Sequence, residues 1–245
     1  MASYTDNFDR TNGAPGANWT AINSGTWAIS SNTLRQSDVT GTYRAIRWNG
    51  GAFDSANFYA RVTAQAPSGM GFGVMVRCPT TGTAATDIDG YAIMGYTGDQ
   101  WYRIEFTNGS DAGYVGLGGT CAANTNYTIE ARADGSTITI YLNSSQLASW
   151  TDATYTTGGA MLLSYGGTII YDNFEAADLA ASTTYPVAAW IRRRTAMLID
   201  SWRMSTWADF TASISRRSRP APRKTSLSLS HPATPRRVFV CTPSA

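Results

Sequence analysis

The chain has 245 residues, of which 43% are apolar, 12% aromatic and 15% charged, so it can bury a sizeable core. Its one histidine, His231, excludes histidine-based metal sites and Ser-His-Asp catalysis. The cysteines Cys78, Cys121 and Cys241 lack the paired spacing of a zinc or redox motif. An odd cysteine count without a signal sequence favours free thiols over a disulfide between Cys78 and Cys121.

Charge divides the chain near residue 179. The first 179 residues hold eight arginines, no lysine and fifteen acidic residues, a formal net charge of −7. Residues 180–245 hold eleven basic and two acidic residues, a net charge of +9. We therefore expect a domain over 1–179 and a basic C-terminal extension over 180–245. The chain lacks both an apolar run of roughly 18 residues and the basic and apolar regions of a signal peptide, so we expect neither membrane insertion nor classical export.

Short β-rich runs fill the first part of the chain. Turn residues recur about every ten residues and separate runs rich in Val, Ile, Thr, Tyr, Phe and Trp, a spacing typical of an all-β sandwich or barrel. Strands are predicted at 4–8, 26–30, 33–37, 43–48, 57–66, 71–78, 90–97, 101–107, 112–117, 127–133, 136–142, 146–150, 159–165 and 168–176.

Alternation within these runs predicts hairpins and a core face. The runs 127–132 and 137–142 alternate apolar and polar side chains, and Asp134-Gly135 between them suits a tight turn. A second hairpin is predicted through 143–145. In the strand 57–66, the side chains predicted to face the core are Phe58, Ala60, Val62 and Ala64.

The basic extension follows different rules. Tyr185-Pro186 marks a boundary, and 187–210 carries apolar residues with a loosely helical period. Beyond Ser213 the sequence is rich in Arg, Ser and Pro, so it is either a disordered arm or a segment that orders against a partner. Three interpretations stay open: docking to a protein partner or to the acidic domain itself, binding to nucleic acid, and unselected sequence such as a frameshift leaves.

The two ends of the domain carry a family resemblance. The opening Asp6-Asn7-Phe8-Asp9-Arg10, with Trp19 and Gly25-Thr26-Trp27 after it, and the closing Tyr171-Asp172-Asn173-Phe174 resemble the concanavalin A-like, laminin-G-like jelly rolls. The version that begins D-x-F-x-R looks most like domains in minor tail or other virion proteins of bacteriophages. The resemblance implies two stacked antiparallel sheets, often a concave surface that faces carbohydrate, and sometimes a structural calcium ion.

The acidic residues do not form a catalytic motif. Glucan-cleaving members of this superfamily carry an E-x-D-x-x-E or E-x-D-x-E strand, and none of the three glutamates here begins one. No cofactor is therefore required, and a structural calcium ion remains a candidate. Two pairs could offer oxygen ligands to it, Asp87 with Asp89 and Asp6 with Asp172. The alternatives are a solvated turn for the first pair and, for the second, neighbouring first and last strands whose phenylalanines pack inward.

One strand face offers a candidate ligand surface. Trp101, Arg103 and Glu105 lie opposite Tyr102, Ile104 and Phe106 in the alternation of their strand. Flat aromatic rings stack on sugar faces, and Arg and Glu hydrogen-bond hydroxyl groups. The predicted carbohydrate-binding residues are Arg77, Tyr91, Tyr96, Trp101, Arg103 and Glu105. The alternative is that these aromatics cover the sheet or contact another subunit.

These observations predict a non-enzymatic protein of a phage virion, in the tail or decorating the capsid. Its jelly roll would bind host-surface carbohydrate or a virion partner, in a homo-oligomer or larger assembly formed in the host cytoplasm. Nucleic acid is a weaker candidate partner, because Phe239 is the only aromatic residue of the extension beyond Phe210. The residues predicted to dock a partner are Arg192, Arg193, Arg194, Arg216 and Arg217. A glycoside hydrolase or another carbohydrate-active enzyme, and a freestanding lectin, are the alternatives.

Overall fold

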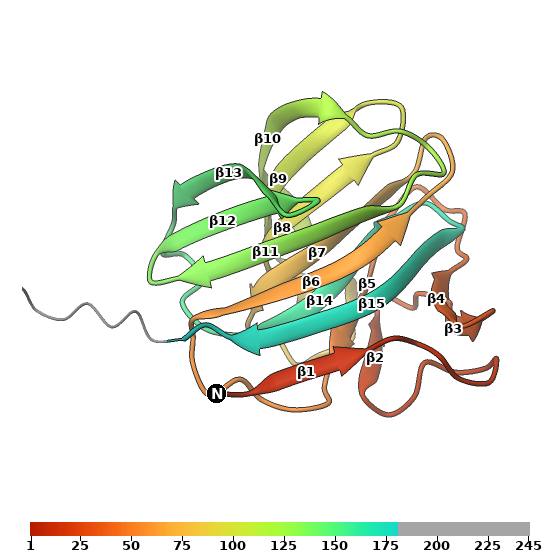
Figure 1. The fold of residues 1–245 in the computed structure, drawn as a ribbon, viewed down its shortest axis with the longest axis horizontal. Coiled ribbons are helices and arrows are strands. Elements are labelled where there is room, and N and C mark those ends of the chain that lie inside the picture. The colour runs from red at the N-terminus through yellow and green to blue at the C-terminus, as the bar shows by residue number, and fades with distance from the viewer. Residues whose placement is uncertain (181–245) are drawn as a thin grey trace, which may run out of the picture. The chain divides into compact units, whose positions relative to one another are not determined.

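The computed structural model describes residues 1–180, and its regular structure there is almost entirely β (Figure 1). The bounds of the strands are β1 Ser3–Asp6, β2 Trp19–Ile22, β3 Trp27–Ser30, β4 Thr33–Gln36, β5 Tyr43–Trp48, β6 Phe58–Gln65, β7 Gly71–Cys78, β8 Gly90–Tyr96, β9 Gln100–Thr107, β10 Ser110–Thr120, β11 Tyr127–Asp134, β12 Thr137–Leu142, β13 Ser145–Thr151, β14 Gly159–Tyr165 and β15 Ile169–Asp178. A 3-10 turn, η1, spans Ala85–Asp87. The predicted helix near 187–210 and the predicted docking arginines lie outside the described residues.

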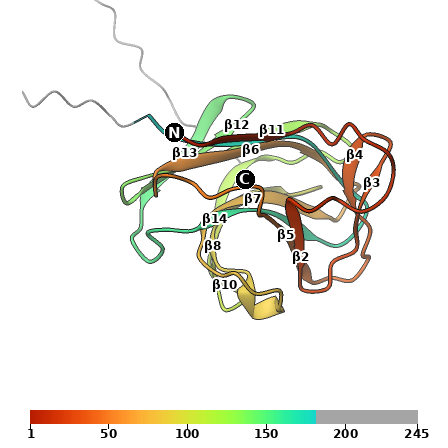
Figure 2. The ribbon, with the colours of Figure 1, turned by 90° about the horizontal axis from the view of Figure 1, so that it is seen from below.

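The strands form two antiparallel sheets. The first sheet has the order β13-β12-β11-β6-β15-β4-β3, with β1 beside β15. The second has the order β10-β9-β8-β7-β14-β5-β2. Figure 1 looks onto the first sheet, and Figure 2 shows the two layers from their edge, with the second sheet curving away below the first. The jelly-roll sandwich predicted from the sequence is confirmed.

Every strand predicted from the alternating runs is present, with ends that differ by at most a few residues. The prediction missed β2, because four residues that follow a loop rich in Gly and Pro are too few to show a period of two. It also missed η1, a single turn without an apolar face. Within residues 1–180, no helix is long and apolar enough to span a membrane.

The predicted turns are confirmed. Gly135 has a φ of 57° and closes the hairpin that pairs Asp134 with Thr137. Asn143 and Ser144 have φ values of 49° and 67°, as a two-residue turn of type I′ requires, and they join β12 to β13. The right-handed twist of the strands favours this turn type.

The first and last strands lie side by side, as the repeated Asp-Asn-Phe sequence suggested. Asp6 pairs with Phe174 in the register of β1 and β15. Phe8 and Phe174 both point into the core, where their ring centroids lie 5.7 and 4.9 Å from that of Trp19. The repeat therefore places an aromatic anchor at each end of the domain.

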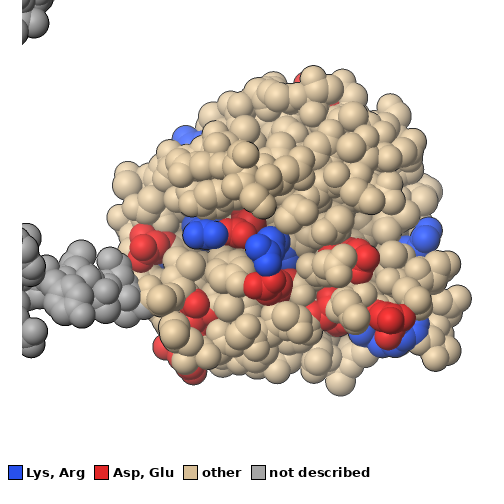
Figure 3. Space-filling view, viewed as in Figure 1, with Lys and Arg blue, Asp and Glu red and all other residues tan. Residues whose placement is uncertain are grey.

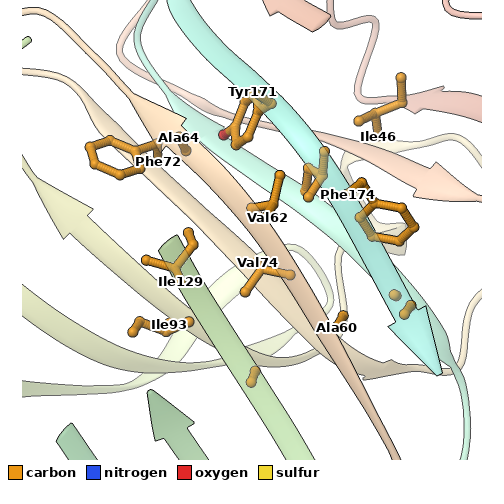
Figure 4. Packing of buried hydrophobic residues seen from close by; sticks show 14 of the residues in the cluster. Ile46, Ala60, Val62, Ala64, Phe72, Val74, Ile93, Ile129, Tyr171 and Phe174 are labelled. Atoms are coloured by element: carbon orange, nitrogen blue, oxygen red, sulfur yellow. The ribbon is translucent and has the colours of Figure 1, made fainter. Parts of the chain in front are cut away.

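The main core lies between the two sheets (Figure 4). From β6, the alternate residues Phe58, Ala60, Val62 and Ala64 are all buried, which confirms their predicted face. Full burial of a large apolar side chain stabilises a protein by about 1.5–3 kcal/mol. Residues from the facing strands that pack here include Ile46, Phe72, Val74, Ile93 and Ile129.

A second apolar cluster fills the concave face of the second sheet. Met75, Met94 and Met161 alternate with residues of the main core along their strands, so they point to the opposite face, yet all three are fully buried. The sheet curls so far that Tyr43 of β5 packs edge-on against Phe106 of β9, with ring centroids 4.8 Å apart and three strands between them in the sheet.

A loop between β7 and β8 closes over this cluster. Arg47 lies opposite Met161 in the register, on the concave face, and its guanidinium donates to the carbonyl oxygens of Thr80, Thr81 and Gly82. These bonds fix the loop at 80–82 against the sheet. The loop therefore covers the part of the concave surface around Met161, whereas Tyr43, Tyr96 and Tyr165 on the same face are half-buried.

The outer face of the first sheet carries a band of paired charges, visible in the middle of Figure 3. Arg61 contacts Glu175 and lies 3.6 Å from Glu130, and Arg132 donates to Glu130. Tyr59 donates to Glu175, and the guanidinium carbon of Arg132 lies 4.5 Å from the ring centroid of Tyr141. We call these six residues the outer-face network.

Candidate ligand-binding site

A small hollow lies where the edge strands of the two sheets face one another. β13 ends the first sheet and β10 ends the second, and both lie at the same side of the sandwich in Figure 1. The hollow between them has a volume of about 80 Å³. We call it the edge cleft, and its lining residues are Tyr91, Arg103, Ile104, Glu105, Gly113, Val115, Trp150 and Asp152.

Strand alternation positions the polar side chains of the edge cleft. Arg103 and Glu105 are two residues apart on β9, so they point to the same face. Gly113 of β10 lies opposite Glu105, and a Cβ built on this glycine would lie 3.8 Å from Oε2 of Glu105. This distance is an ordinary van der Waals contact, so a Cβ would fit there, and glycine leaves that space beside the carboxylate open.

The floor of the edge cleft is held by hydrogen bonds. The Tyr91 hydroxyl donates to Oδ1 of Asp152 at 2.6 Å and accepts from the backbone N–H of Tyr155 at 3.0 Å. Oδ1 of Asp152 also accepts from the backbone N–H of Thr154. Burial raises the pKa of Tyr91, and the hydrogen bond to Asp152 adds to this effect, so the pKa reaches about 12. Tyr91 therefore stays a hydrogen-bond donor at neutral pH.

The same contacts keep Asp152 ionised. Burial opposes ionisation of this carboxyl, but the hydrogen bonds from Tyr91 and Thr154 and the charge of Arg103 outweigh it and lower its pKa. A carboxylate accepts hydrogen bonds only. Asp152 thus presents a fixed negative charge at the edge cleft.

Arg103 and Glu105 are the uncommitted groups of the edge cleft. The guanidinium of Arg103 lies over Trp150, with its carbon 4.8 Å from the ring centroid, a cation–π arrangement. Within residues 1–180, neither Arg103 nor Glu105 makes a side-chain hydrogen bond or an ion pair. Both side chains are only half-buried. They can therefore exchange water for the hydroxyl or amide groups of a ligand.

The structure brings together three of the six residues predicted to bind carbohydrate, namely Tyr91, Arg103 and Glu105. The predicted exposed position of Trp101 is wrong, because its side chain is fully buried between the sheets. Its ring packs edge-on against Phe72 and Tyr127, with centroids 5.7 and 5.0 Å away. Trp101 is a core residue and cannot stack on a ligand.

The predicted exposure of Arg77 is wrong as well. Its side chain is 1% exposed, and its guanidinium donates to the carbonyl oxygens of Tyr155, Ala56 and Gly135. Its φ of 55° turns the end of β7 so that the side chain points inward. Arg77 therefore ties together three loops at one end of the sandwich.

Tyr96 belongs to a group of tyrosines on the concave face of the second sheet. Its hydroxyl lies 2.9 Å from that of Tyr43, and its ring packs on Tyr102, Tyr165 and Tyr114. Burial and the bond to Tyr43 raise its pKa. These rings contact one another, and Tyr96 does not line the edge cleft.

The Asp6 and Asp172 pair does not fit a cation. Both carboxylate oxygens of Asp6 accept from the Arg10 guanidinium, and they also accept from Trp19 Nε1 and the backbone N–H of Phe8. Burial raises the pKa of Asp6, but these donors outweigh burial and lower it. Asp172 accepts from the backbone N–H of Asn173 at 2.7 Å. Protein donors thus take both carboxylate oxygens of Asp6, and one oxygen of Asp172 accepts a local backbone N–H.

Asp87 and Asp89 also accept from separate protein donors. Asp87 accepts from the backbone N–H of Ala84 and caps η1, whereas Asp89 accepts from the backbone N–H of Asn108 at the β9–β10 turn. The part of the chain that the structure describes contains no group of three or more His, Cys, Asp or Glu side chains suited to a metal. Cys78 and Cys121 are free and buried.

Sequence reasoning missed Trp150 and Asp152 as site residues. Trp150 belongs to β13 of the first sheet and Asp152 directly follows that strand, 47 and 49 residues along the chain from Arg103. Their strand was predicted, but nothing local shows that β13 and β10 end their sheets on the same side. The order of the strands carries that information.

The comparisons with known proteins show a fold and no family. No protein-family model matches the chain, and no curated protein matches its sequence. Among solved structures, the carbohydrate-binding module CBM66 from Bacillus subtilis is 20% identical, with a TM-score of 0.53 over 64% of this chain and 94% of that one. The Bacillus licheniformis β-glucanase is 16% identical, with a TM-score of 0.52 over 73% and 99%.

A third similar structure is the Emp46p carbohydrate recognition domain in its potassium-bound form. It is 7% identical, with a TM-score of 0.51 over 71% of this chain and 95% of that one. The similar structures thus include a binding module, a hydrolase and a recognition domain, which one architecture can all serve. Residues 1–180 form a two-sheet jelly-roll sandwich, and the likeness to these structures shows that fold alone.

Proposed function

We propose that this protein binds carbohydrate at the edge cleft and does not cleave it. The observation that carries the proposal is the pair of uncommitted polar side chains, Arg103 and Glu105, beside the half-buried ring of Trp150. Sugar recognition uses such a set, in which an aromatic ring covers the apolar face of the sugar and directional donors and acceptors contact its hydroxyl groups. The carbohydrate named for several proteins of similar fold supports the same class of ligand.

Two charge arrangements support a function without catalysis. Glycoside hydrolysis needs one carboxyl that holds a proton near neutral pH and a second that does not. The pKa of Asp152 is lowered, and the Tyr59 hydroxyl and Arg61 lower the pKa of Glu175. Neither of these two carboxylates is suited to act as the acid.

A glycan array with the full-length protein tests the proposal. The wild type is expected to bind at least one class of glycan. Arg103→Ala and Trp150→Ala should weaken that binding at least about tenfold, a loss of about 1.4 kcal/mol. Arg61→Ala is the matched control, because it removes an arginine of similar exposure from the outer-face network. Binding that is unchanged in both cleft variants would refute the edge cleft as the site.

One observation favours a second candidate function, a glycoside hydrolase. Glu105 and Asp152 line the same hollow, and two carboxylates that flank a glycosidic bond are the basis of such chemistry. Incubation of the protein with the glycans that it binds, followed by measurement of reducing ends, separates the two functions. Release of reducing ends that Glu105→Gln abolishes would establish the hydrolase.

We further propose that the protein is part of a phage virion and displays the jelly roll to a host surface. The support for this role is the opening Asp6-Asn7-Phe8-Asp9-Arg10 and its likeness to virion proteins. Residues 180–245, with a net charge of +9, are the candidate attachment segment. Particles from a host that expresses the tagged chain should carry it, and the chain truncated after Leu179 should be lost from them. A freestanding lectin would stay outside the particles.

A further inference from the structure

The segment between β13 and β14 crosses from the first sheet to the second beside the edge cleft. β13 ends at Thr151 and β14 begins at Gly159, and the two strands belong to different sheets. At the start of the crossing, the backbone N–H of Asp152 donates to the carbonyl oxygen of Ser136, in the turn between β11 and β12. Asp152 is therefore attached to the first sheet, although it lines the cleft together with residues of the second.

Tyr155, three residues further on, is attached to the second sheet through three separate groups. Its backbone N–H donates to the Tyr91 hydroxyl of β8 at 3.0 Å, and its carbonyl oxygen accepts from the Arg77 guanidinium of β7 at 3.2 Å. Its hydroxyl donates to the carbonyl oxygen of Phe106 in β9 at 2.8 Å and lies 3.0 Å from the Thr107 hydroxyl. Because β7, β8 and β9 are neighbours in the sheet, this residue is bonded to three consecutive strands.

Packing and burial support this attachment. The Tyr155 ring packs edge-on against Tyr91, with ring centroids 5.5 Å apart. Arg77 is buried, and its guanidinium also donates to the carbonyl oxygen of Gly135, which precedes Ser136 in the same turn of the first sheet. Burial raises the pKa of Tyr155, so its hydroxyl remains a donor at neutral pH. The segment from 152 to 155 is thus fixed to both sheets.

The spacing between the two sides of the edge cleft depends on this attachment. Trp150 and Asp152 form one side, on β13 and just after it, whereas Arg103 and Glu105 belong to β9. Within residues 1–180, no strand pairing joins β13 to the second sheet. The Tyr155 hydroxyl bonds to the residue that follows Glu105. This bond therefore limits how far the end of β13 can move from the polar side chains of β9.

We propose that Tyr155 is the positioning residue of the edge cleft. It holds Trp150 and Asp152 at the distance from the β9 side chains at which one sugar contacts both sides of the cleft. Tyr155 does not line the cleft, so it acts through these two residues. Groups that are in place before the ligand arrives lose less conformational freedom on binding. This inference rests on the proposed function of the edge cleft.

The test compares two substitutions of tyrosine by phenylalanine in the full-length protein. Tyr155→Phe removes the bonds of the hydroxyl and keeps the ring and both backbone bonds. Tyr59→Phe is the matched control, because Tyr59 is also half-buried and its hydroxyl donates to Glu175 in the outer-face network. Each variant loses a hydroxyl hydrogen bond, so both should melt earlier than the wild type. A purely structural role of Tyr155 predicts no other difference between them.

The first readout is the contact between Trp150 and Arg103 in the protein without ligand. The guanidinium carbon lies 4.8 Å from the Trp150 ring centroid, so nuclear Overhauser effects between the indole and the Arg103 side chain are expected in the wild type. They should weaken or disappear in Tyr155→Phe and persist in Tyr59→Phe. This measurement needs no glycan, so its result does not depend on the proposed function.

The second readout is the affinity for the strongest ligand of the glycan array. The dissociation constant should rise at least about fivefold in Tyr155→Phe and stay within about twofold of the wild type in Tyr59→Phe. Wild-type nuclear Overhauser effects or wild-type affinity in Tyr155→Phe would overturn the proposal. Absence of glycan binding by the wild type would instead refute the proposed function, and the nuclear Overhauser effects would still show whether Tyr155 sets the spacing of the cleft.

Discussion

The outer-face network and the edge cleft are built from the same residue types and differ in how these residues are paired. Arg61 and Arg132 are each committed to a glutamate, and Tyr59 donates to Glu175. In the edge cleft, Arg103 lies over Trp150, and neither it nor Glu105 has a polar partner within residues 1–180. Arginine, acid and aromatic residues together therefore do not identify a binding surface.

This difference indicates which charged side chains can still contribute to ligand binding. A paired charge must give up a protein partner before it can contact a ligand, so a ligand gains little from it. An unpaired charge gives up only water. Figure 3 shows the charged residues of the network at the centre of a broad open face, where a binding site would first be sought. Within residues 1–180, the lack of polar partners for Arg103 and Glu105 instead indicates the edge cleft.

The largest expected effect distinguishes two tryptophans. Trp101→Ala should lower the free energy of unfolding by about 3–5 kcal/mol, because it empties a fully buried space next to Phe72 and Tyr127. Trp150→Ala, at the half-buried rim of the edge cleft, should cost less than about 1 kcal/mol and weaken glycan binding. Denaturant unfolding of both variants measures the difference. Equal losses would place Trp150 in the core.

The next effect compares two glutamates. Glu130→Gln should lower the free energy of unfolding by about 1–3 kcal/mol, because Glu130 is buried and contacts both Arg61 and Arg132. Glu105→Gln should change it by less than about 0.5 kcal/mol, because no protein group depends on that carboxylate. Urea unfolding measures both losses. A larger loss for Glu105→Gln than for Glu130→Gln would contradict the structural role given to Glu130.

A smaller effect is expected from acid. The Tyr59 hydroxyl and Arg61 hold the pKa of Glu175 below its ordinary value of 4.5 against the effect of burial. The folded state then binds fewer protons than the unfolded state, so this stability is present above pH 4.5 and is lost as the pH falls through the lowered pKa. Unfolding measured between about pH 3 and 6 should show a shallower decline for Glu175→Gln than for the wild type. An identical decline would contradict the role of this pair.

The smallest expected effect concerns Asp152, whose pKa is lowered by Tyr91, Thr154 and Arg103 against burial. Protonation of Asp152 should weaken glycan binding before the domain unfolds, as the pH falls below the ordinary value of 3.8. Asp152→Asn should remove this step from the pH profile of binding while leaving the midpoint of acid unfolding nearly unchanged. If glycan binding by Asp152→Asn still weakens at low pH, then another group is responsible for the acid dependence.

The fold was predictable because local signals agree with it. Alternation places Phe58 and Val62 inward, and the Asp134-Gly135 and Asn143-Ser144 turns fix the registers of two hairpins. The repeated Asp-Asn-Phe sequence gave the pairing of the first and last strands. Each of these features depends on neighbours in sequence or on one repeat that can be read directly.

The candidate site was only partly predictable, because alternation gives the two faces of a strand but not their surroundings. On β9, Trp101 shares a face with Arg103, yet Trp101 is buried in the core between the sheets, whereas Arg103 lines the edge cleft. The opposite face is apolar too, because the sheet curls around Met75 and Phe106. Trp150 enters the site through strand order, which a local pattern does not contain.

The most direct test is calorimetric titration of the strongest ligand from the glycan array into the wild type, Glu105→Gln and Glu130→Gln at neutral pH. We expect Glu105→Gln to bind at least about tenfold more weakly at an unchanged melting temperature, while Glu130→Gln binds like the wild type and melts earlier. We also expect the glycan to be recovered intact. Full affinity in Glu105→Gln, or consumption of the glycan by the wild type, would contradict these expectations.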